Sequence, residues 1–164
     1  MSETRIRRLR ETIARARADV NVVRADALGW APDAPVDAVL LDAPCSATGI
    51  FRRHADVLHR VRPAVIAEMA ALQARLLARV ADWVRPGGVL VFATCSLEPE
   101  EGEAQLDAFL AARGDYGLAA ITAKELPAGI APDARGYVRT LPGMLEAEGG
   151  CDGFFIARLR RASA

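Results

Sequence analysis

The stretch VDAVLLDAPCSATG, residues 36–49, decides the expected fold. It begins with an almost continuous apolar run of strand length, which ends at Asp42. An Ala-Pro pair then breaks the strand pattern, and Cys45 follows directly. A strand that is apolar at nearly every position is typical of a parallel sheet covered on both faces. Ligands bind such sheets beyond the carboxyl ends of the strands, which is where Asp42 and Cys45 are expected.

A second stretch repeats this layout, since residues 88–94 read GVLVFAT and Cys95 follows them. A helical pattern over residues 63–84 separates the two strands, and a strand, helix, strand unit places its strands parallel in one sheet. Cys45, Cys95 and Asp42 would then face a shared cleft. A free cysteine is more often a small buried residue, but the position of both at strand exits favours a functional role.

Length and composition indicate one folded domain. The chain has 164 residues, 52% of them hydrophobic, and its formal net charge is zero, which excludes a disordered or polycationic chain. Lys124 is the only lysine among the 21 basic residues. The arginine bias fits either genome composition or phosphate binding, because the guanidinium fork donates two hydrogen bonds to a phosphate.

The cysteine count argues against a disulfide scaffold or a zinc site. There are three cysteines, Cys45, Cys95 and Cys151, and no two of them form a C-x-x-C pair. Cys151 lies in a glycine-rich connection and is assigned no role. No apolar run approaches the roughly 18 residues of a membrane span, and residues 1–3 open no signal peptide. These patterns predict a soluble, cytoplasmic, reduced protein without a metal.

A basic segment follows the first strand exit. Arg52 and Arg53 leave the expected cleft directly and are placed to meet a phosphate. His54 and His59 lack the spacing and partners of metal ligands, so we expect them in a surface or loop role.

The first part of the chain predicts a helix and a short strand. The helix covers residues 4–18, with Ser2 as a plausible N-cap and arginines on a solvated face. The strand covers residues 21–25 and ends at Asp26. Asp26 could accept hydrogen bonds from a cofactor or merely cap the following turn, and the residues alone leave both interpretations open.

The last part predicts a helix and two strands. Residues 98–101 read EPEE and start the helix, where acidic side chains complement the helix dipole. Residues 112–132 are uninformative. Residues 137–141 and 154–159 predict an antiparallel strand pair that closes the sheet.

Four ordered motifs together resemble the Sun-type RNA cytosine-5 methyltransferases, most closely the bacterial branch that acts on small-subunit ribosomal RNA. They are DAPCSATG at 42–49, RRH at 52–54, VRPGGVLVFATCSLEPEE at 84–101 and DGFFIARL at 152–159. The resemblance implies an α/β, Rossmann-like fold that uses S-adenosylmethionine, with a mostly parallel sheet and a late antiparallel strand pair. It treats residues 1–164 as a single, partial catalytic domain.

The resemblance also implies roles for individual residues. Cys95 matches the nucleophile, and Cys45 matches the cysteine that helps to release the product. Asp42 matches a residue beside the target base and the methionine end of the cofactor, and Asp26 matches an acidic contact to its nucleoside. The implied partner is RNA, and a nucleophilic thiol is expected to be partly exposed in an electropositive setting.

The family's glycine-rich cofactor loop and first strand have no counterpart in these residues. We therefore expect a catalytic half-site, truncated at its N-terminal side, with weak or no activity alone. The alternative is an inactive remnant or a module of the same family that binds RNA or another partner. A cysteine-based redox protein is disfavoured because no vicinal thiols occur in the sequence.

Overall fold

The computed structural model describes residues 3–163, and the chain forms two compact units, Met1–Ala31 and Pro32–Ala164. The first unit contains α1 (Glu3–Ala16), which confirms the helix predicted near the start of the chain. The N-cap predicted at Ser2 lies outside the described residues.

The strand predicted over residues 21–25 is wrong. These residues are irregular. Val23, in the middle of the segment, is 51% exposed, and Val20, directly before it, is 52% exposed. A short apolar run becomes a strand only when a neighbouring strand satisfies its backbone groups. Among residues 3–163, no ladder includes this segment.

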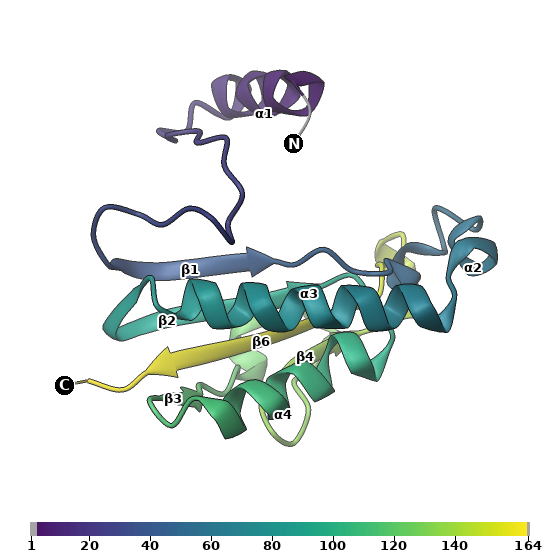
Figure 1. Ribbon diagram of the computed structural model, residues 1–164. Helices are drawn as coiled ribbons and strands as arrows, with labels where there is room; N and C mark the ends of the chain where they lie inside the picture. Colours follow the sequence, from purple (N-terminus) through teal and green to yellow (C-terminus); the bar gives the residue numbers. More distant parts are fainter. Residues whose placement is uncertain (1–2, 164) are drawn as a thin grey trace. The chain divides into compact units, whose positions relative to one another are not determined.

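The second unit is built on a mixed five-stranded sheet (Figure 1). Its strands are β1 (Val36–Asp42), β2 (Val84–Thr94), β3 (Tyr116–Leu118), β4 (Val138–Thr140) and β6 (Phe154–Arg161). The order is β1-β2-β6-β3, and β4 also pairs with β6. β1 and β2 are parallel, whereas β6 is antiparallel to β2, β3 and β4. The predicted late antiparallel pair is therefore confirmed as β4 and β6.

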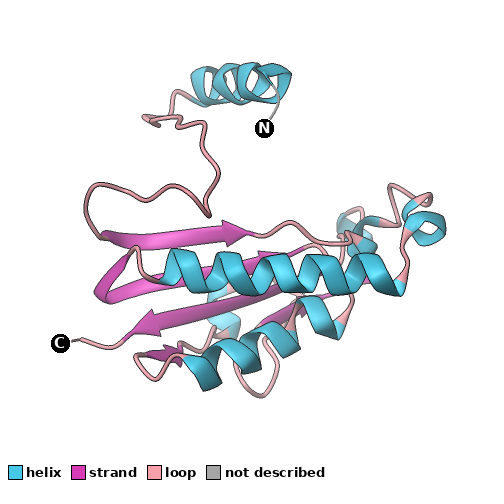
Figure 2. Cartoon of the chain, in the orientation of Figure 1, coloured by secondary structure: helices cyan, strands magenta, loops and turns pink. Residues whose placement is uncertain are grey.

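The longer helices of this unit lie on one face of the sheet (Figure 2). α3 (Pro63–Ala81) connects β1 to β2, as predicted, and α4 (Glu103–Ala112) follows β2. A single turn, α2 (Val57–Arg60), precedes α3, and the short β5 (Pro142–Leu145) lies between β4 and β6. Alternate residues of β2 and β6 meet α3 and α4 in the core.

The prediction that β1 is covered on both faces is wrong. Val39 and Leu41 pack against the core, but Leu40 points the other way and is 69% exposed. The reason is the placement of the connections, because α3 and α4 lie on the same side of the sheet (Figures 1 and 2). The apolar run of β1 therefore has one buried and one exposed face.

Two element boundaries also differ from the predictions. β2 begins at Val84 and not at residue 88 as predicted, so the Arg-Pro-Gly-Gly stretch forms the irregular first part of the strand. The ladder with β1 shifts register there, between Val36 and Ala38. The helix expected from residue 98 starts as a 3-10 turn, Pro99–Glu101, before α4.

Candidate functional site

The two cysteines follow the carboxyl ends of neighbouring parallel strands. The β1 ladder ends where the Ala43 N–H donates to the carbonyl of Ala93 at 2.9 Å. Pro44 has no N–H to continue it, so the chain leaves the sheet before Cys45. Cys95 directly follows the last residue of β2. Asp42, the last residue of β1, pairs in register with Ala93 and therefore lies at the same rim.

The loop after β1 docks closely on the loop after β2. The Gly49 N–H donates to the carbonyl of Cys95 at 2.9 Å, and Gly153 donates to the carbonyl of Gly49 at 2.8 Å. A β-carbon at Gly49 would lie 2.1 Å from the Gly153 carbonyl oxygen. Only glycine therefore fits at Gly49, and its absence of a side chain lets the two strand exits meet.

The result is direct contact between two free thiols. The sulfur atoms of Cys45 and Cys95 are 3.4 Å apart, and both side chains are partly buried. This is hydrogen-bonding distance, well beyond the covalent S–S length of about 2.05 Å. The structure thus brings together two predicted site residues that are 50 positions apart. The earlier objection that the chain lacks vicinal thiols holds for the sequence but not for the folded protein.

The contact separates the proton affinities of the two thiols. The hydrogen bond with Cys45 lowers the pKa of Cys95 to about 7, although burial and the charges of Asp42 and Glu101 act in the opposite direction. The same hydrogen bond, together with burial, raises the pKa of Cys45. Cys95 therefore ionises before Cys45, whose raised pKa keeps its proton in place near neutral pH.

The prediction of an electropositive setting for Cys95 is wrong in its main point. The thiol is partly exposed, as expected, but its pKa falls because of a neighbouring S–H group and not because of cations. Asp42 is exposed, and its charge raises the pKa of Cys95. Arg53 is close enough for the Cys95 charge to make a small contribution to its raised pKa, after Asp152.

Asp26 lies in the first unit and caps a turn. Its Oδ1 accepts a hydrogen bond from the Leu28 N–H at 3.0 Å, and its carbonyl accepts one from Gly29 at 2.9 Å. This is the turn-capping role that the sequence left open beside the cofactor role. The side chain is exposed.

The two arginines after the first strand exit have different surroundings. The Arg53 guanidinium pairs with the Asp152 carboxylate through its Nε and one terminal nitrogen, and the Asp152 side chain is nearly buried. The Arg52 side chain lies against Gly150, on a cavity of about 440 Å³ lined also by Phe51 and Pro142. Arg53 therefore ties this segment to the β4–β6 connection, while Arg52 faces an open groove.

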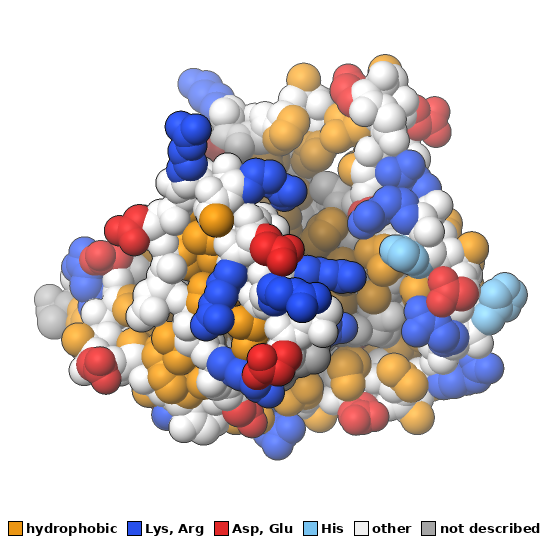
Figure 3. Space-filling view, turned by 90° about the horizontal axis from the view of Figure 1, so that it is seen from above, with side chains coloured by type: hydrophobic (Ala, Val, Ile, Leu, Met, Phe, Trp, Pro, Cys, Tyr) orange, Lys and Arg blue, Asp and Glu red, His pale blue; other side chains and the backbone are white. Residues whose placement is uncertain are grey.

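His54 and His59 are both exposed, as predicted, and Figure 3 shows the histidine side chains on the surface near basic ones. Within residues 3–163, no three histidine, cysteine or acidic side chains are grouped as a metal site requires. No helix of the described chain is both long enough and apolar enough to cross a membrane.

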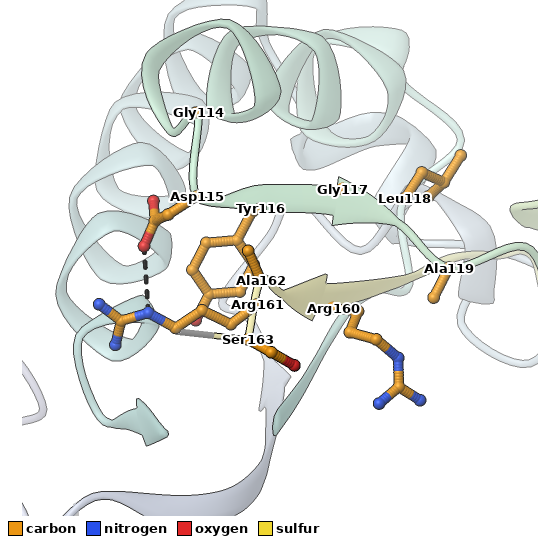
Figure 4. Close-up of a pocket in the computed structure, with 10 residues that line it drawn as sticks. All are labelled: Gly114, Asp115, Tyr116, Gly117, Leu118, Ala119, Arg160, Arg161, Ala162 and Ser163. Carbon is orange, nitrogen blue, oxygen red and sulfur yellow. Dashed lines mark hydrogen bonds and ion pairs between the residues drawn. The ribbon is translucent and has the colours of Figure 1, made fainter. Parts of the chain in front are cut away.

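One cavity lies away from the thiols. It has a volume of about 480 Å³ and is lined by Asp115, Tyr116, Arg160 and Arg161, with an Asp115–Arg161 ion pair of 3.1 Å (Figure 4). Arg161 is at the end of β6 opposite to Phe155, which pairs with Thr94 beside Cys95. Its lining includes no cysteine.

A second cavity opens beside Cys45. Its volume is about 390 Å³, and its walls are mostly apolar side chains from the first strand exit, α2 and α3, with Arg60 at the edge. This cavity adjoins the Cys45 sulfur, whereas the cavity lined by Arg161 does not.

Two polar residues at the site were missed by sequence reasoning. Glu101 and Gln73 are both fully buried, and the Gln73 amide donates to the Glu101 carboxylate at 3.1 Å. The acidic run at residues 98–101 was attributed to the helix dipole, which is wrong for Glu101. The available signal was Gln73 itself, a polar residue beside the apolar stripe of α3.

The fold and the paired strand exits define the class of protein. This is an α/β protein with the Rossmann-like fold of S-adenosylmethionine-dependent methyltransferases, and Cys45 and Cys95 follow the carboxyl ends of two parallel strands. Comparison with known sequences then gives the family. Residues 1–160 match the family described as 16S rRNA methyltransferase RsmB/F, and the chain belongs to that family.

Individual relatives agree with this assignment. The chain is 42% identical over 164 residues to "Ribosomal RNA small subunit methyltransferase B" of Xanthomonas campestris pv. campestris, which covers 97% of this chain and 36% of that protein. The protein of the same name from Xylella fastidiosa is 43% identical over 159 residues, covering 94% of this chain and 35% of that protein. The chain thus spans about a third of the length of these relatives.

A solved structure shares the fold. The crystal structure of NSun6 from Pyrococcus horikoshii with SFG matches with a TM-score of 0.79 and 27% identity, over 99% of this chain and 40% of that one. The predicted Rossmann-like methyltransferase fold and the Sun-type resemblance are both confirmed by these comparisons.

Proposed function

We propose that this chain contributes the catalytic thiols for methylation of cytosine C5 in ribosomal RNA, with S-adenosylmethionine as methyl donor. The observation that supports this best is the 3.4 Å contact between Cys45 and Cys95 at adjoining strand exits. Family membership supports ribosomal RNA as the substrate class. The choice of C5 and the thiol mechanism are our inference from the site.

Cytosine C5 is a weak nucleophile until the ring is activated. In the proposed reaction the Cys95 thiolate adds to C6, the C5–C6 π electrons move onto the ring, and C5 then takes the methyl group. A pKa of about 7 for Cys95 keeps a large fraction of this thiol ionised at neutral pH. We also propose that the Asp42 carboxyl group, at the same rim, contacts the target base during addition.

The second thiol has a role in product release. After methyl transfer a base takes the C5 proton, the C5–C6 double bond forms again, and the Cys95 sulfur leaves as a thiolate. Cys45 remains a protonated thiol because its pKa is raised, so it can donate a hydrogen bond to the departing sulfur. The pair therefore divides the work between a nucleophile and a hydrogen-bond donor.

The residues at the rim fit a methionine ammonium group. Asp42 is exposed at the carboxyl end of β1, and its charge acts on Cys95. A residue that contacts both the methyl donor and the target base must lie this near to the thiol. We propose that Asp26 contacts the nucleoside hydroxyls through Oδ2, because Oδ1 already accepts the hydrogen bond from the Leu28 N–H. S-adenosylmethionine would supply an electrophilic methyl group on its sulfonium. The NSun6 structure was solved with SFG, an analogue of this cofactor.

RNA binding is proposed for the segment after the first strand exit. Arg52 faces an open groove and can contact a phosphate, whereas a phosphate at Arg53 must compete with Asp152. The target base must leave its stack, because the thiol and the methyl donor approach the ring from outside the helix.

Transfer of labelled methyl groups from S-adenosylmethionine to 16S ribosomal RNA tests this proposal. We expect at most weak transfer by the 164-residue chain alone, loss of that transfer in Cys95→Ala, and no change in Cys151→Ala, which alters a thiol remote in sequence from both strand exits. Cys45→Ala should accumulate a covalent RNA adduct that is stable in denaturing gels. RNA binding without any transfer would instead favour a binding module, and transfer by Cys95→Ala would contradict the mechanism.

A further inference from the structure

The interior of the site contains a carboxylate that the proposed chemistry does not use. Glu101 is 0% exposed. Its two oxygens accept hydrogen bonds from the Ser46 N–H at 2.8 Å, the Ser96 hydroxyl at 2.6 Å and the Gln73 amide at 3.1 Å. The Ser46 hydroxyl also donates to it. Four donors therefore converge on one buried carboxylate, an arrangement that an acceptor without a proton satisfies.

The two serines link Glu101 to the two thiols. Ser46 follows Cys45, and Ser96 follows Cys95. Both serine side chains bond to the same oxygen, Oε2 of Glu101. One carboxylate thus holds the backbone next to each sulfur, although the two cysteines come from different loops.

Further polar contacts close the same junction. Thr48, in the first loop, accepts a hydrogen bond from the Leu97 N–H in the second loop at 2.9 Å. The Gln73 amide reaches from α3 to the carbonyl of Pro44 at 2.8 Å. Arg139 donates to the carbonyl of Ser96 at 2.8 Å from the other side. The loops are therefore anchored to α3 and β4 as well as to each other.

Burial of a carboxylate is costly unless its hydrogen bonds are complete. A complete buried network is rigid, because movement of one member leaves a charged acceptor without its donors. Glu101 sits at the centre of this network, and hydrogen bonds to a charged group are the strong ones. Displacement of either loop would break at least one of them.

We infer that Glu101 is a positioning residue that holds the Cys45 and Cys95 loops in the register at which their sulfurs touch. The consequence of this positioning role for RNA methylation rests on the proposed function. The sulfur contact itself is a property of this chain and is measurable without RNA or cofactor.

The test compares Glu101→Gln with Glu100→Gln, both in a Cys151→Ala background that leaves only the thiol pair. Glu100 is exposed, so its variant is the matched control. Diamide is the oxidant: it takes two electrons and two protons from the two thiols, which form one disulfide, and becomes a hydrazine. We expect Glu101→Gln to slow formation of the Cys45–Cys95 disulfide by about ten- to a hundredfold, because small displacements of reacting groups have effects of this size.

The pH dependence of Cys95 alkylation is a second readout. It separates a loss of positioning from a simple loss of charge, because the two shift the midpoint in opposite directions. The Glu101 charge raises the pKa of Cys95, so loss of the charge alone would lower the alkylation midpoint. Loss of positioning removes the hydrogen bond from Cys45 and raises the midpoint above about 7. We expect the midpoint to rise in Glu101→Gln and to stay unchanged in Glu100→Gln.

A folded Glu101→Gln chain with wild-type disulfide formation and a lower or unchanged midpoint overturns the inference. If Glu101→Gln does not fold, Ser46→Ala and Ser96→Ala each remove one hydroxyl that bonds to Glu101, and wild-type rates in both would overturn the inference equally. Absence of methyl transfer in the unmodified chain would remove the proposed function, while the thiol measurements would still decide the role of Glu101.

Discussion

The exits of β1 and β2 have the same layout in the sequence and opposite properties in the folded protein. In each, an apolar strand ends at the rim of the sheet and a cysteine and serine follow. Yet the pKa of Cys45 is raised, and that of Cys95 is lowered to about 7. The two thiols touch, so they cannot ionise independently, and one becomes the donor of the other.

This difference shows that the reactivity of each thiol is a property of the pair. Burial acts in the same direction on both thiols. Their shared hydrogen bond acts in opposite directions and decides which one is the thiolate. Three changes to the strand exits should break or sharpen this contrast.

The largest effect is expected from Gly49→Ala, which separates the two exits. The new methyl group would lie 2.1 Å from the Gly153 carbonyl oxygen and 2.9 Å from that of Cys95, both of them backbone atoms. Overpacking of this kind costs about 3 kcal/mol, and the effect is measured as the free energy of unfolding in urea. Gly114→Ala is the control, since its β-carbon meets nothing within 4 Å. Equal stability of the two variants would contradict the close docking of the loops.

An intermediate effect is expected from Cys45→Ala on the ionisation of Cys95. The variant removes the hydrogen bond that lowers the pKa of Cys95, so the pKa rises from about 7 and less thiolate is present at neutral pH. The rate of alkylation by iodoacetamide at pH 7 should fall about fivefold, because a rise of about one pKa unit from about 7 lowers the thiolate fraction at pH 7 from about one half to about one tenth. Cys45→Ser retains a donor and should fall less. A midpoint that stays near 7 in Cys45→Ala would show that another group ionises Cys95.

Cys45→Ala should also change how the stability of the fold depends on pH. The pKa of Cys95 is lower in the folded protein than in the unfolded chain, so its ionisation stabilises the fold above the ordinary thiol pKa. That contribution disappears as the pH falls through about 7. The unfolding free energy of Cys45→Ala should therefore vary less with pH than that of the unmodified chain between about pH 6 and about pH 9. This window includes both the lowered and the ordinary pKa of the Cys95 thiol.

The smallest effect is expected beyond the first exit, from Arg52→Ala. Loss of one phosphate contact should weaken RNA binding a few-fold and reduce the slope of log affinity against log salt by about one. Arg53→Ala should leave that slope closer to the wild-type value, because Asp152 already occupies its guanidinium. A larger change in slope for Arg53 than for Arg52 would reverse these assignments.

Much of the site followed from local sequence patterns. The apolar runs before Asp42 and Cys95 and the helix between them predicted two parallel strands with their reactive ends together, and the structure has this arrangement. The failures were segments whose state depends on distant partners. Residues 21–25 have the composition of a strand but no ladder in the described chain, and Leu40 is exposed because both neighbouring helices lie on the opposite face.

The sequence by itself determined the strand ends, the two thiols and the family, because apolar periodicity and motif order are written along the chain. Only the tertiary structure decided which thiol is acidic and that Glu101 is buried between the two loops. Both facts depend on contacts across about 50 residues, and hydrogen bonding and desolvation act on atoms that are near in space, whatever their separation along the chain.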